Sequence, residues 1–405
     1  MNRFPLLAAA AAMALTAFSG SAHADEDPQV PPPPPMDMTS LNASSVPGIV
    51  REWPKFGAET EVNFEYDHLS SKGAPAGSAL NVQAGQQFLV EFDKHFSISN
   101  LWTLQPLDEI EPGRDRVLRH HALFVEELFA RWNNQAVNIK VGKFAQNFAR
   151  GWYVVPGLYG QDIVGDYGIS ETLGIEAQFD LGFPSRGLHQ LSISAFELDR
   201  SPLSDSLFTR RGPLHLADGG AANTKAPKSF AVSYDATNVP VFANGALNYQ
   251  LSAARLAHGS DGDAAEQRYA ASADINLPLN GGTIAQTLRG RFNEFRLFGE
   301  AVRVDNENGF KGHRADYQTV SAELASGPWV FDTSVTLRQH LSAGLPTVND
   351  DLESAAIGYN LPSDTVVALG IAREHIDGST GTYVGISISQ VLTTCDRCLI
   401  RARHY

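Results

Sequence analysis

Residues 137–181 read VNIKVGKFAQNFARGWYVVPGLYGQDIVGDYGISETLGIEAQFDL. Apolar and polar side chains alternate at both ends of this stretch, over 137–141 and 173–181, as they do in a strand with one apolar and one wetted face. Between these ends lies an insertion, Phe144 to Glu171, that is rich in aromatic residues and glycine. So many apolar groups need a surface that covers them. The stretch therefore predicts two amphipathic strands whose connection folds back against the protein.

The same period of two recurs along most of the chain. It is clear over 62–67, 88–92, 230–235, 247–252, 331–338, 355–361 and 384–388. A sustained period of 3.6 is nearly absent, so we predict an all-β protein. Residues 56–392 divide into about 16 amphipathic segments.

Short and long connections alternate between these segments. The short ones are 93–95, 133–135, 183–187, 238–245, 279–282, 326–328 and 362–364. The long ones are 70–78, 105–121, 144–171, 200–228, 259–266, 305–314, 342–351 and 375–381. Barrels that cross a bilayer have tight turns at one end and long loops at the other. We therefore predict a transmembrane antiparallel up-and-down β-barrel of about 16 strands over 56–392, with a constriction loop folded into its lumen.

The N-terminus has the layout of a secretory signal peptide. Arg3 precedes an apolar run, and Ala22-His23-Ala24 offers a small-x-small cleavage site. We expect residues 1–24 to be removed, which leaves 405 − 24 = 381 residues. The apolar run is shorter than the roughly 20 residues that a membrane-spanning helix needs. Residues 25–55 contain five consecutive prolines and are predicted to form a periplasmic spacer.

The composition excludes several classes of function. The formal net charge of −14 argues against nucleic acid as a partner. Neither the motifs of serine hydrolases and zinc proteases nor a phosphate-binding loop occur, so we predict no enzyme, no catalytic residue and no cofactor. The pair His120-His121 is expected to be solvated in a loop. Acidic loop clusters near 261–266 and 305–307 carry only part of a calcium-loop pattern, and no metal site is predicted.

Both cysteines lie in the tail, as Cys395-Asp-Arg-Cys398. Two ligands are too few for a structural zinc site on one chain. In an oxidising compartment a small disulfide between Cys395 and Cys398 is the simpler expectation. Residues 393–405 are predicted to form a polar C-terminal tail after the last strand.

A barrel of this size is too wide for side chains to fill, so we expect a water-filled lumen lined by polar residues. Carboxylates of the insertion would then face basic side chains of the wall and set a limit on size. The predicted constriction consists of Asp162, Asp166 and Glu171 on one side and Lys140, Arg289, Arg291 and Arg338 on the other. The alternative is a lid that packs on the outer rim or against a neighbouring subunit.

Residues Leu123 to Leu181, including LFVEELFARW, VGKF and GLYGQDIVGDYGISETLG, resemble general porin-like outer-membrane proteins of Gram-negative proteobacteria. The resemblance implies an outer-membrane channel, embedded in lipid, that lets small polar solutes and ions diffuse passively. It also implies a homotrimer. One departure is the end of the chain, because porin-like barrels usually finish on an aromatic residue that closes the last strand. Here that strand is predicted to end near Leu392, before the polar tail.

Two other functions remain open at this point. One is a substrate-selective outer-membrane transport or binding barrel, for example for anionic solutes, in which Arg289 and Arg291 would share one face of a strand. The other is a soluble periplasmic β-rich binding protein. Membrane fractionation separates the last from the first two.

Overall fold

The computed structural model describes residues 53–395 except 72, 108–109, 135, 183–185, 210, 212–213, 243–244 and 280–292. The predicted signal peptide, nearly all of the predicted spacer, Arg289, Arg291 and Cys398 lie outside the described residues. The disulfide between Cys395 and Cys398 and the N-terminal boundaries therefore stay predictions.

The described chain consists mainly of β-strands. The strands are β1 (Lys55–Ser71), β2 (Gly77–Glu91), β3 (Phe96–Pro106), β4 (Asp115–Val117), β5 (His121–Asn133), β6 (Val137–Phe144), β7 (Thr172–Asp180), β8 (Leu188–Leu198), β9 (Ser229–Pro240), β10 (Ala246–Leu256), β11 (Glu266–Pro278), β12 (Glu294–Asp305), β13 (Arg314–Ser326), β14 (Trp329–Leu341), β15 (Val348–Leu361), β16 (Thr365–Ile376) and β17 (Ser379–Cys395). The last strand thus reaches three residues beyond its predicted end at Leu392.

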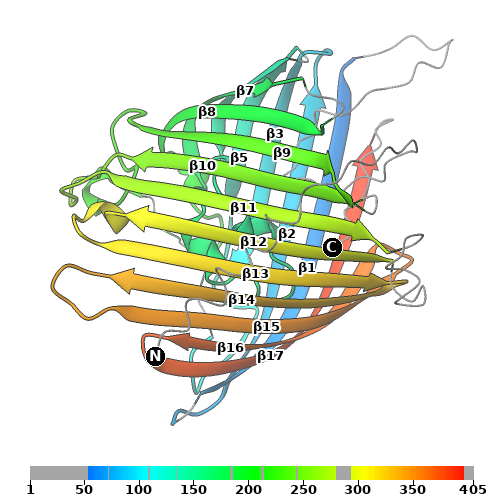
Figure 1. Cartoon of the computed structure of the whole chain (residues 1–405), viewed down its shortest axis with the longest axis vertical. Coiled ribbons are helices and arrows are strands. Elements are labelled where there is room, and N and C mark those ends of the chain that lie inside the picture. Colours follow the sequence, from blue (N-terminus) through cyan, green and yellow to red (C-terminus); the bar gives the residue numbers. More distant parts are fainter. Residues whose placement is uncertain are drawn as a thin grey trace.

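Sixteen of the 17 strands form one closed antiparallel wall in chain order (Figure 1). β1 closes it by pairing with β17, from Gly57 opposite Cys395 to Ser71 opposite Gly381. The short strand β4 is an addition that pairs in parallel with β2. The predicted barrel of about 16 strands is confirmed.

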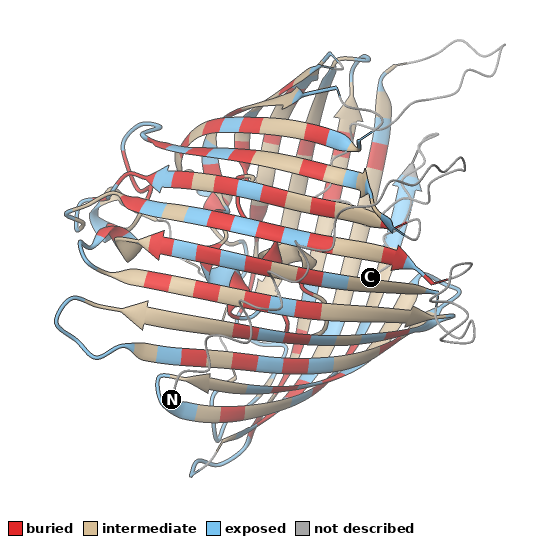
Figure 2. Ribbon diagram, in the orientation of Figure 1, coloured by how far each residue is buried: buried red, intermediate tan, exposed pale blue. Residues whose placement is uncertain are grey.

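Buried and exposed residues alternate along the strands (Figure 2), and the large exposed residues of the wall are apolar whereas many of the buried ones are polar. On β1, Phe64 and Tyr66 share one face and are 49% and 46% exposed, whereas Asp67 on the other face is 3% exposed. On the paired strand β17, Ile388 is 48% exposed and Ser387 is 8% exposed. This is the reverse of a water-soluble barrel and suits a wall whose outer face meets lipid.

The alternation of short and long connections is borne out only in part. The β1–β2 connection (72–76) and the β14–β15 connection (342–347), predicted to be long, are no longer than the short β7–β8 connection (181–187). Two more connections fall in the length class opposite to the one predicted. The β16–β17 connection, predicted to be long, is a two-residue turn at Asp377 and Gly378, because β16 and β17 stay paired as far as Ile376 and Ser379. Both turn residues have positive φ, 51° and 78°, which fits the tight hairpin turn that Asp-Gly favours. The β11–β12 connection, predicted to be short, extends over 279–293, mostly outside the described residues.

Within the described residues, helices occur only in the connections. They are α2 (Gly151–Val154) and the 3-10 turns η2 (Val164–Tyr167), η3 (Pro202–Ser204), η4 (Leu216–Asp218) and η6 (Glu307–Gly309). In the part of the chain that the structure describes, no helix has the length and apolar character to cross a membrane.

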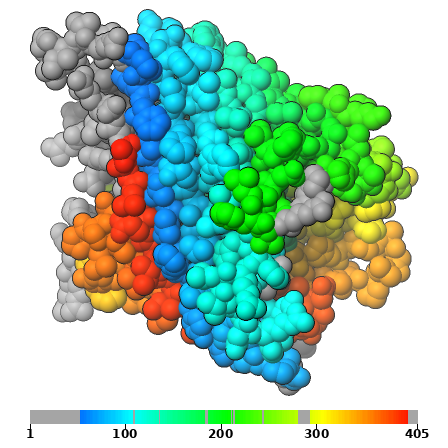
Figure 3. All heavy atoms as spheres, turned by 180° about the vertical axis from the view of Figure 1, so that it is seen from behind, coloured from blue at the N-terminus to red at the C-terminus, as the bar shows by residue number. Residues whose placement is uncertain are grey.

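A notch in the wall lies where β6 ends early. β6 pairs only with residues 128–133 of β5, although β5 begins at His121. The β8–β9 loop, residues 199–228, fills the notch, because Leu207 N–H donates to Leu123 O at 2.9 Å and Thr209 N–H donates to His121 O at 3.2 Å. Figure 3 shows this green segment beside the cyan strands. The early end of β6 releases the chain into the connection that follows it.

Candidate functional site

Residues 145–171, called here the lumen loop, leave β6 and run along the inward-facing side chains of the wall. The outward leg crosses β9 and β10. Asn147 Nδ2 donates to Asp235 Oδ2 at 2.9 Å, and Ala149 N–H donates to Ser252 Oγ at 3.2 Å. Asp235 and Ser252 lie on the polar face of their strands, so the loop has entered the barrel at this point.

The far turn of the lumen loop reaches the seam where the barrel closes. Tyr159 OH donates to Asp67 Oδ1 on β1 at 2.6 Å, and its ring lies 5.7 Å from the ring of Tyr383 on β17. Gly385 on β17 makes room for this approach, because a Cβ there would collide with the Tyr159 hydroxyl. The loop thus spans the interior from β6 to β1.

The return leg follows β14, β13 and β11. Asp166 Oδ2 lies 2.5 Å from a guanidinium nitrogen of Arg338 on β14. The ring of Tyr167 meets that of Tyr317 on β13 edge to face at 5.0 Å. Arg268 on β11 donates to Tyr167 O at 2.8 Å and to Gly168 O at 3.2 Å. Both legs therefore rest on the half of the wall that runs from β9 round to β1.

Apolar side chains of the lumen loop form much of the buried core. Phe148 and Val164 are fully buried, and Val155, Tyr167 and Ile163 are 1–3% exposed. They pack with inward-facing wall residues such as Phe298, Val302 and Leu352. This packing explains why the insertion is aromatic. The loop thus packs against the inner wall, unlike the alternative of a lid on the outer rim. That the loop acts as a constriction stays a prediction.

Glu300 on β12 is the main anchor of the loop. Its carboxylate accepts the N–H of Arg150 at 2.6 Å, the N–H of Gly151 at 2.8 Å and the hydroxyl of Tyr167. One wall residue thus joins the outward and return legs. Position 151 admits only glycine in this arrangement, because a Cβ would collide with Glu300 and Tyr167.

A second anchor is built around Asp274 on β11. It binds Arg150 of the loop at 2.6 Å and Arg296 of β12 at 3.4 Å, and it accepts from Asn248 of β10 at 2.9 Å. Sequence reasoning did not single out Glu300 or Asp274 as contacts of the insertion. Their alternation with apolar neighbours indicates that they face the lumen. It does not indicate their position along the barrel axis, which decides whether they meet the loop.

The structure brings together two of the predicted constriction residues, Asp166 and Arg338. Arg338 also binds Asp350 on β15 at 2.8 Å. Asp162 is exposed on the loop and lies close enough to Glu65 of β1 for their charges to interact. Lys140 is paired instead with Glu176 of the neighbouring strand β7, at 2.9 Å. Arg289 and Arg291 lie outside the described residues.

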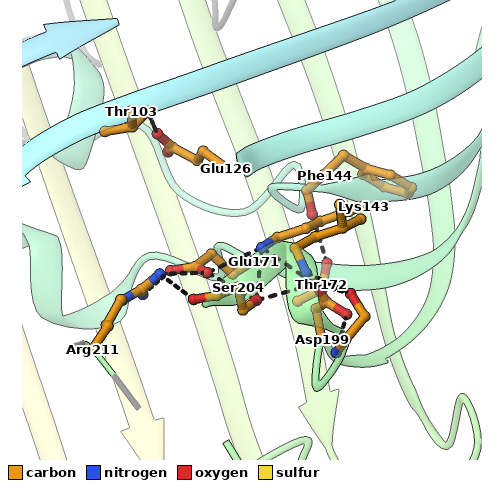
Figure 4. Close-up of polar contacts among 11 residues, drawn as sticks. Thr103, Glu126, Lys143, Phe144, Glu171, Thr172, Asp199, Ser204 and Arg211 are labelled. Atoms are coloured by element: carbon orange, nitrogen blue, oxygen red, sulfur yellow. Dashed lines mark hydrogen bonds and ion pairs between the residues drawn. The ribbon is translucent and has the colours of Figure 1, made fainter. Parts of the chain in front are cut away.

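Glu171, predicted for the constriction, belongs to a separate ionic cluster at the root of the loop (Figure 4). It binds Lys143 at 3.1 Å and is also paired with Arg211 of the β8–β9 loop. Lys143 is fully buried and also lies 3.2 Å from Asp199 and 2.7 Å from Ser204 Oγ. We call Lys143, Glu171, Asp199, Ser204 and Arg211 the latch cluster.

The ionic surroundings of Glu171 favour its charged form. Burial opposes ionisation, but the hydrogen bonds and charges of Arg211 and Lys143 outweigh it and hold the pKa of the Glu171 carboxyl below its ordinary range. The latch cluster therefore ties the β8–β9 loop to the root of the lumen loop with ionised groups at neutral pH.

Residues noted for metal binding serve other purposes in the described loops. Asp261 accepts the N–H of Gly220 at 2.8 Å, and Glu266 pairs with Arg268 at 2.6 Å. The expectation that His120-His121 is solvated in a loop is wrong for His121, which begins β5, is only 8% exposed, and accepts from Val82 N–H through Nε2 at 3.2 Å. Among the described residues, no three His, Cys, Asp or Glu side chains are placed to hold a metal ion.

No family model matches this chain, and no curated protein sequence matches it. Solved structures do match its fold. OprB of Pseudomonas putida at high pH superposes with a TM-score of 0.51 at 10% identity, over 84% of this chain and 94% of that one. The outer membrane channel DcaP of Acinetobacter baumannii gives 0.51 at 8% identity, over 83% and 97%.

A third match is a loop L8 deletion mutant of OmpT, an outer membrane protein of Vibrio cholerae. It gives a TM-score of 0.50 at 10% identity, over 83% of this chain and 99% of that one. At these identities the matches establish a shared fold. Each of the three barrels is matched over almost its whole length, so the present chain has the architecture of complete outer-membrane barrels.

Proposed function

We propose that this protein is a porin of a Gram-negative outer membrane, a water-filled channel through which small polar solutes and ions diffuse passively. One observation carries the proposal. The lumen loop is fastened inside a closed barrel to one half of the wall, by Glu300, Asp274, Arg338 and Asp67. The opposite side of the wall, from β2 to β8, carries polar inward side chains such as Gln87, Ser99 and Asn138.

The lumen loop serves as the constriction in this proposal. Its lumen-facing edge carries exposed polar groups, among them Gln161, Asp162 and Asp166. Its apolar side chains are turned into the wall, so the loop occupies lumen volume without offering solutes an apolar surface. A passage bounded by such groups admits hydrated solutes and rejects them by size.

A liposome swelling assay tests passive diffusion. Liposomes that contain the purified protein should swell in isotonic solutions of neutral sugars, at rates that fall steeply as the sugar becomes larger. Liposomes without protein, and liposomes with heat-denatured protein, are the controls. Absence of swelling, or swelling for one sugar with saturation of its rate, would contradict a general diffusion channel.

The proposal includes a homotrimer, and the outer face of the barrel supports it. Polar side chains sit on the outward phase of the neighbouring strands β17, β1, β2 and β3. Thr60 Oγ1 donates to Gln86 Oε1 at 2.5 Å, and Asn100 and Gln390 share that phase. Polar groups facing lipid tails are costly, whereas a second subunit can cover them. A detergent-corrected mass of three chains is expected, and a mass of one chain would refute the trimer.

A further inference from the structure

We infer that the channel prefers cations over anions. This inference rests on the proposed function, because selectivity presupposes a conducting pore. It concerns the sign of the charge that the lumen presents to a solute. The ion pairs and hydrogen bonds of the described lumen residues support it.

Four basic side chains of the described lumen each lie against a carboxylate, and Arg150 shares its carboxylate with Arg296. Lys140 lies 2.9 Å from Glu176, Arg150 lies 2.6 Å from Asp274, and Arg268 lies 2.6 Å from Glu266. Arg338 is bound by two carboxylates, Asp166 at 2.5 Å and Asp350 at 2.8 Å. A cation held against a carboxylate at such distances contributes little field to a passing ion.

Several lumen carboxylates are held by neutral groups instead. Glu300 accepts two backbone N–H groups and a tyrosine hydroxyl. Asp235 accepts from Asn147, Gln250 and Ser233. Neutral donors stabilise a carboxylate without cancelling its charge. The described lumen therefore holds more carboxyl groups than basic partners for them.

The surplus is concentrated where the lumen loop meets β1. Asp67 accepts from Tyr159 at 2.6 Å and shares a hydrogen bond with Glu65 two residues away. Asp162 of the loop tip is exposed and interacts electrostatically with Glu65. The exposed carboxyl group of Asp162 places negative charge beside the passage at this point. A confined passage walled by low-dielectric protein strengthens the field of such a group.

This charge pattern disfavours the hypothesis, left open by the sequence, of a barrel that selects anionic solutes. That hypothesis depended on Arg289 and Arg291, which lie outside the described residues, whereas Lys140, Arg150, Arg268 and Arg338 are each paired with a carboxylate. The whole chain carries a formal net charge of −14, in the same direction. The balance of charge thus favours cations of small size, including inorganic ions and protonated amines.

Reversal potential in a planar bilayer tests the inference. With the full-length protein in a gradient of KCl, the potential should lie toward the equilibrium potential of K⁺. Asp162→Asn should lower the K⁺/Cl⁻ permeability ratio by about twofold or more. Glu353→Gln is the matched control, because Glu353 is exposed on the outward phase of β15 and should leave the ratio unchanged.

The outcomes separate the inference from the function on which it rests. A bilayer without channel activity contradicts the porin itself. Channels with a potential at zero or toward Cl⁻ overturn the cation preference and leave the porin standing. A potential that moves equally in Asp162→Asn and Glu353→Gln shows that the loop tip does not set the selectivity, which also overturns the inference.

Discussion

At the scale of the residue, a few wall side chains hold the lumen loop in place. The sequence predicted that carboxylates of the loop face basic side chains of the wall, and one such pair, Asp166 and Arg338, forms. It did not predict that Glu300 and Asp274 anchor the loop, or that Lys140 pairs along the wall with Glu176. Alternation tells which face a side chain occupies. The tilt and stagger of the strands decide which residues lie at the same level along the barrel axis and so face each other across the lumen. Tilt and stagger cannot be read from a single sequence.

Replacing Glu300 should release the loop from its main anchor. In Glu300→Ala the N–H groups of Arg150 and Gly151 and the hydroxyl of Tyr167 lose their acceptor. Each donor left buried and unsatisfied costs about 1–3 kcal/mol of folding free energy. Hydrogen exchange at Gly151 should accelerate about tenfold or more. Glu300→Gln, which keeps one acceptor oxygen, should be intermediate, and Glu353→Gln should exchange like the native protein. Native exchange in Glu300→Ala would show that the anchor does not hold the loop.

At the scale of the element, the short strand β6 explains two loops at once. Because β6 ends at Phe144, the chain is free to turn into the lumen, and the exposed edge of β5 is available to the β8–β9 loop. The sequence marked both connections as long but gave no sign that they meet. Their meeting point is the latch cluster, where Lys143, Glu171 and Arg211 come from three separate segments.

The latch cluster should make the β8–β9 loop sensitive to acid. Since the folded pKa of Glu171 lies below its ordinary value of 4.5, its contribution to stability is complete above that value and is lost as the pH falls through the lowered pKa. The pKa of Asp199 is also lowered, because hydrogen bonds from Ser201 and the charge of Lys143 outweigh the effect of burial. The loop should stay fixed at neutral pH and loosen only below about 4.5.

A spin label on the loop measures this loosening. Phe208 is 68% exposed, so Phe208→Cys, made after both native cysteines are changed to serine, carries the label at little structural cost. Its mobility should rise steeply as the pH drops below 4.5, and Glu171→Gln should already be mobile at neutral pH. A label that stays immobile in Glu171→Gln would mean that the latch cluster does not fasten the loop.

At the scale of the whole molecule, the periodicity of the sequence was sufficient for the barrel. The count of wall strands and their antiparallel order follow from alternation and from the rhythm of connections. The errors came from turns: Asp377-Gly378 needs only two residues, whereas the surrounding polar stretch had indicated a long loop. The surplus of lumen carboxylates over basic partners became visible only once pairs such as Arg150–Asp274 could be located.

The claim that matters most is that this barrel conducts, and single-channel recording in a planar bilayer measures it directly. The purified full-length protein should insert in discrete steps of equal conductance, and the step size should grow in proportion to the conductivity of the KCl solution, as expected for a water-filled passage. A correctly folded barrel, verified by circular dichroism, that inserts into the bilayer and stays electrically silent would contradict the account.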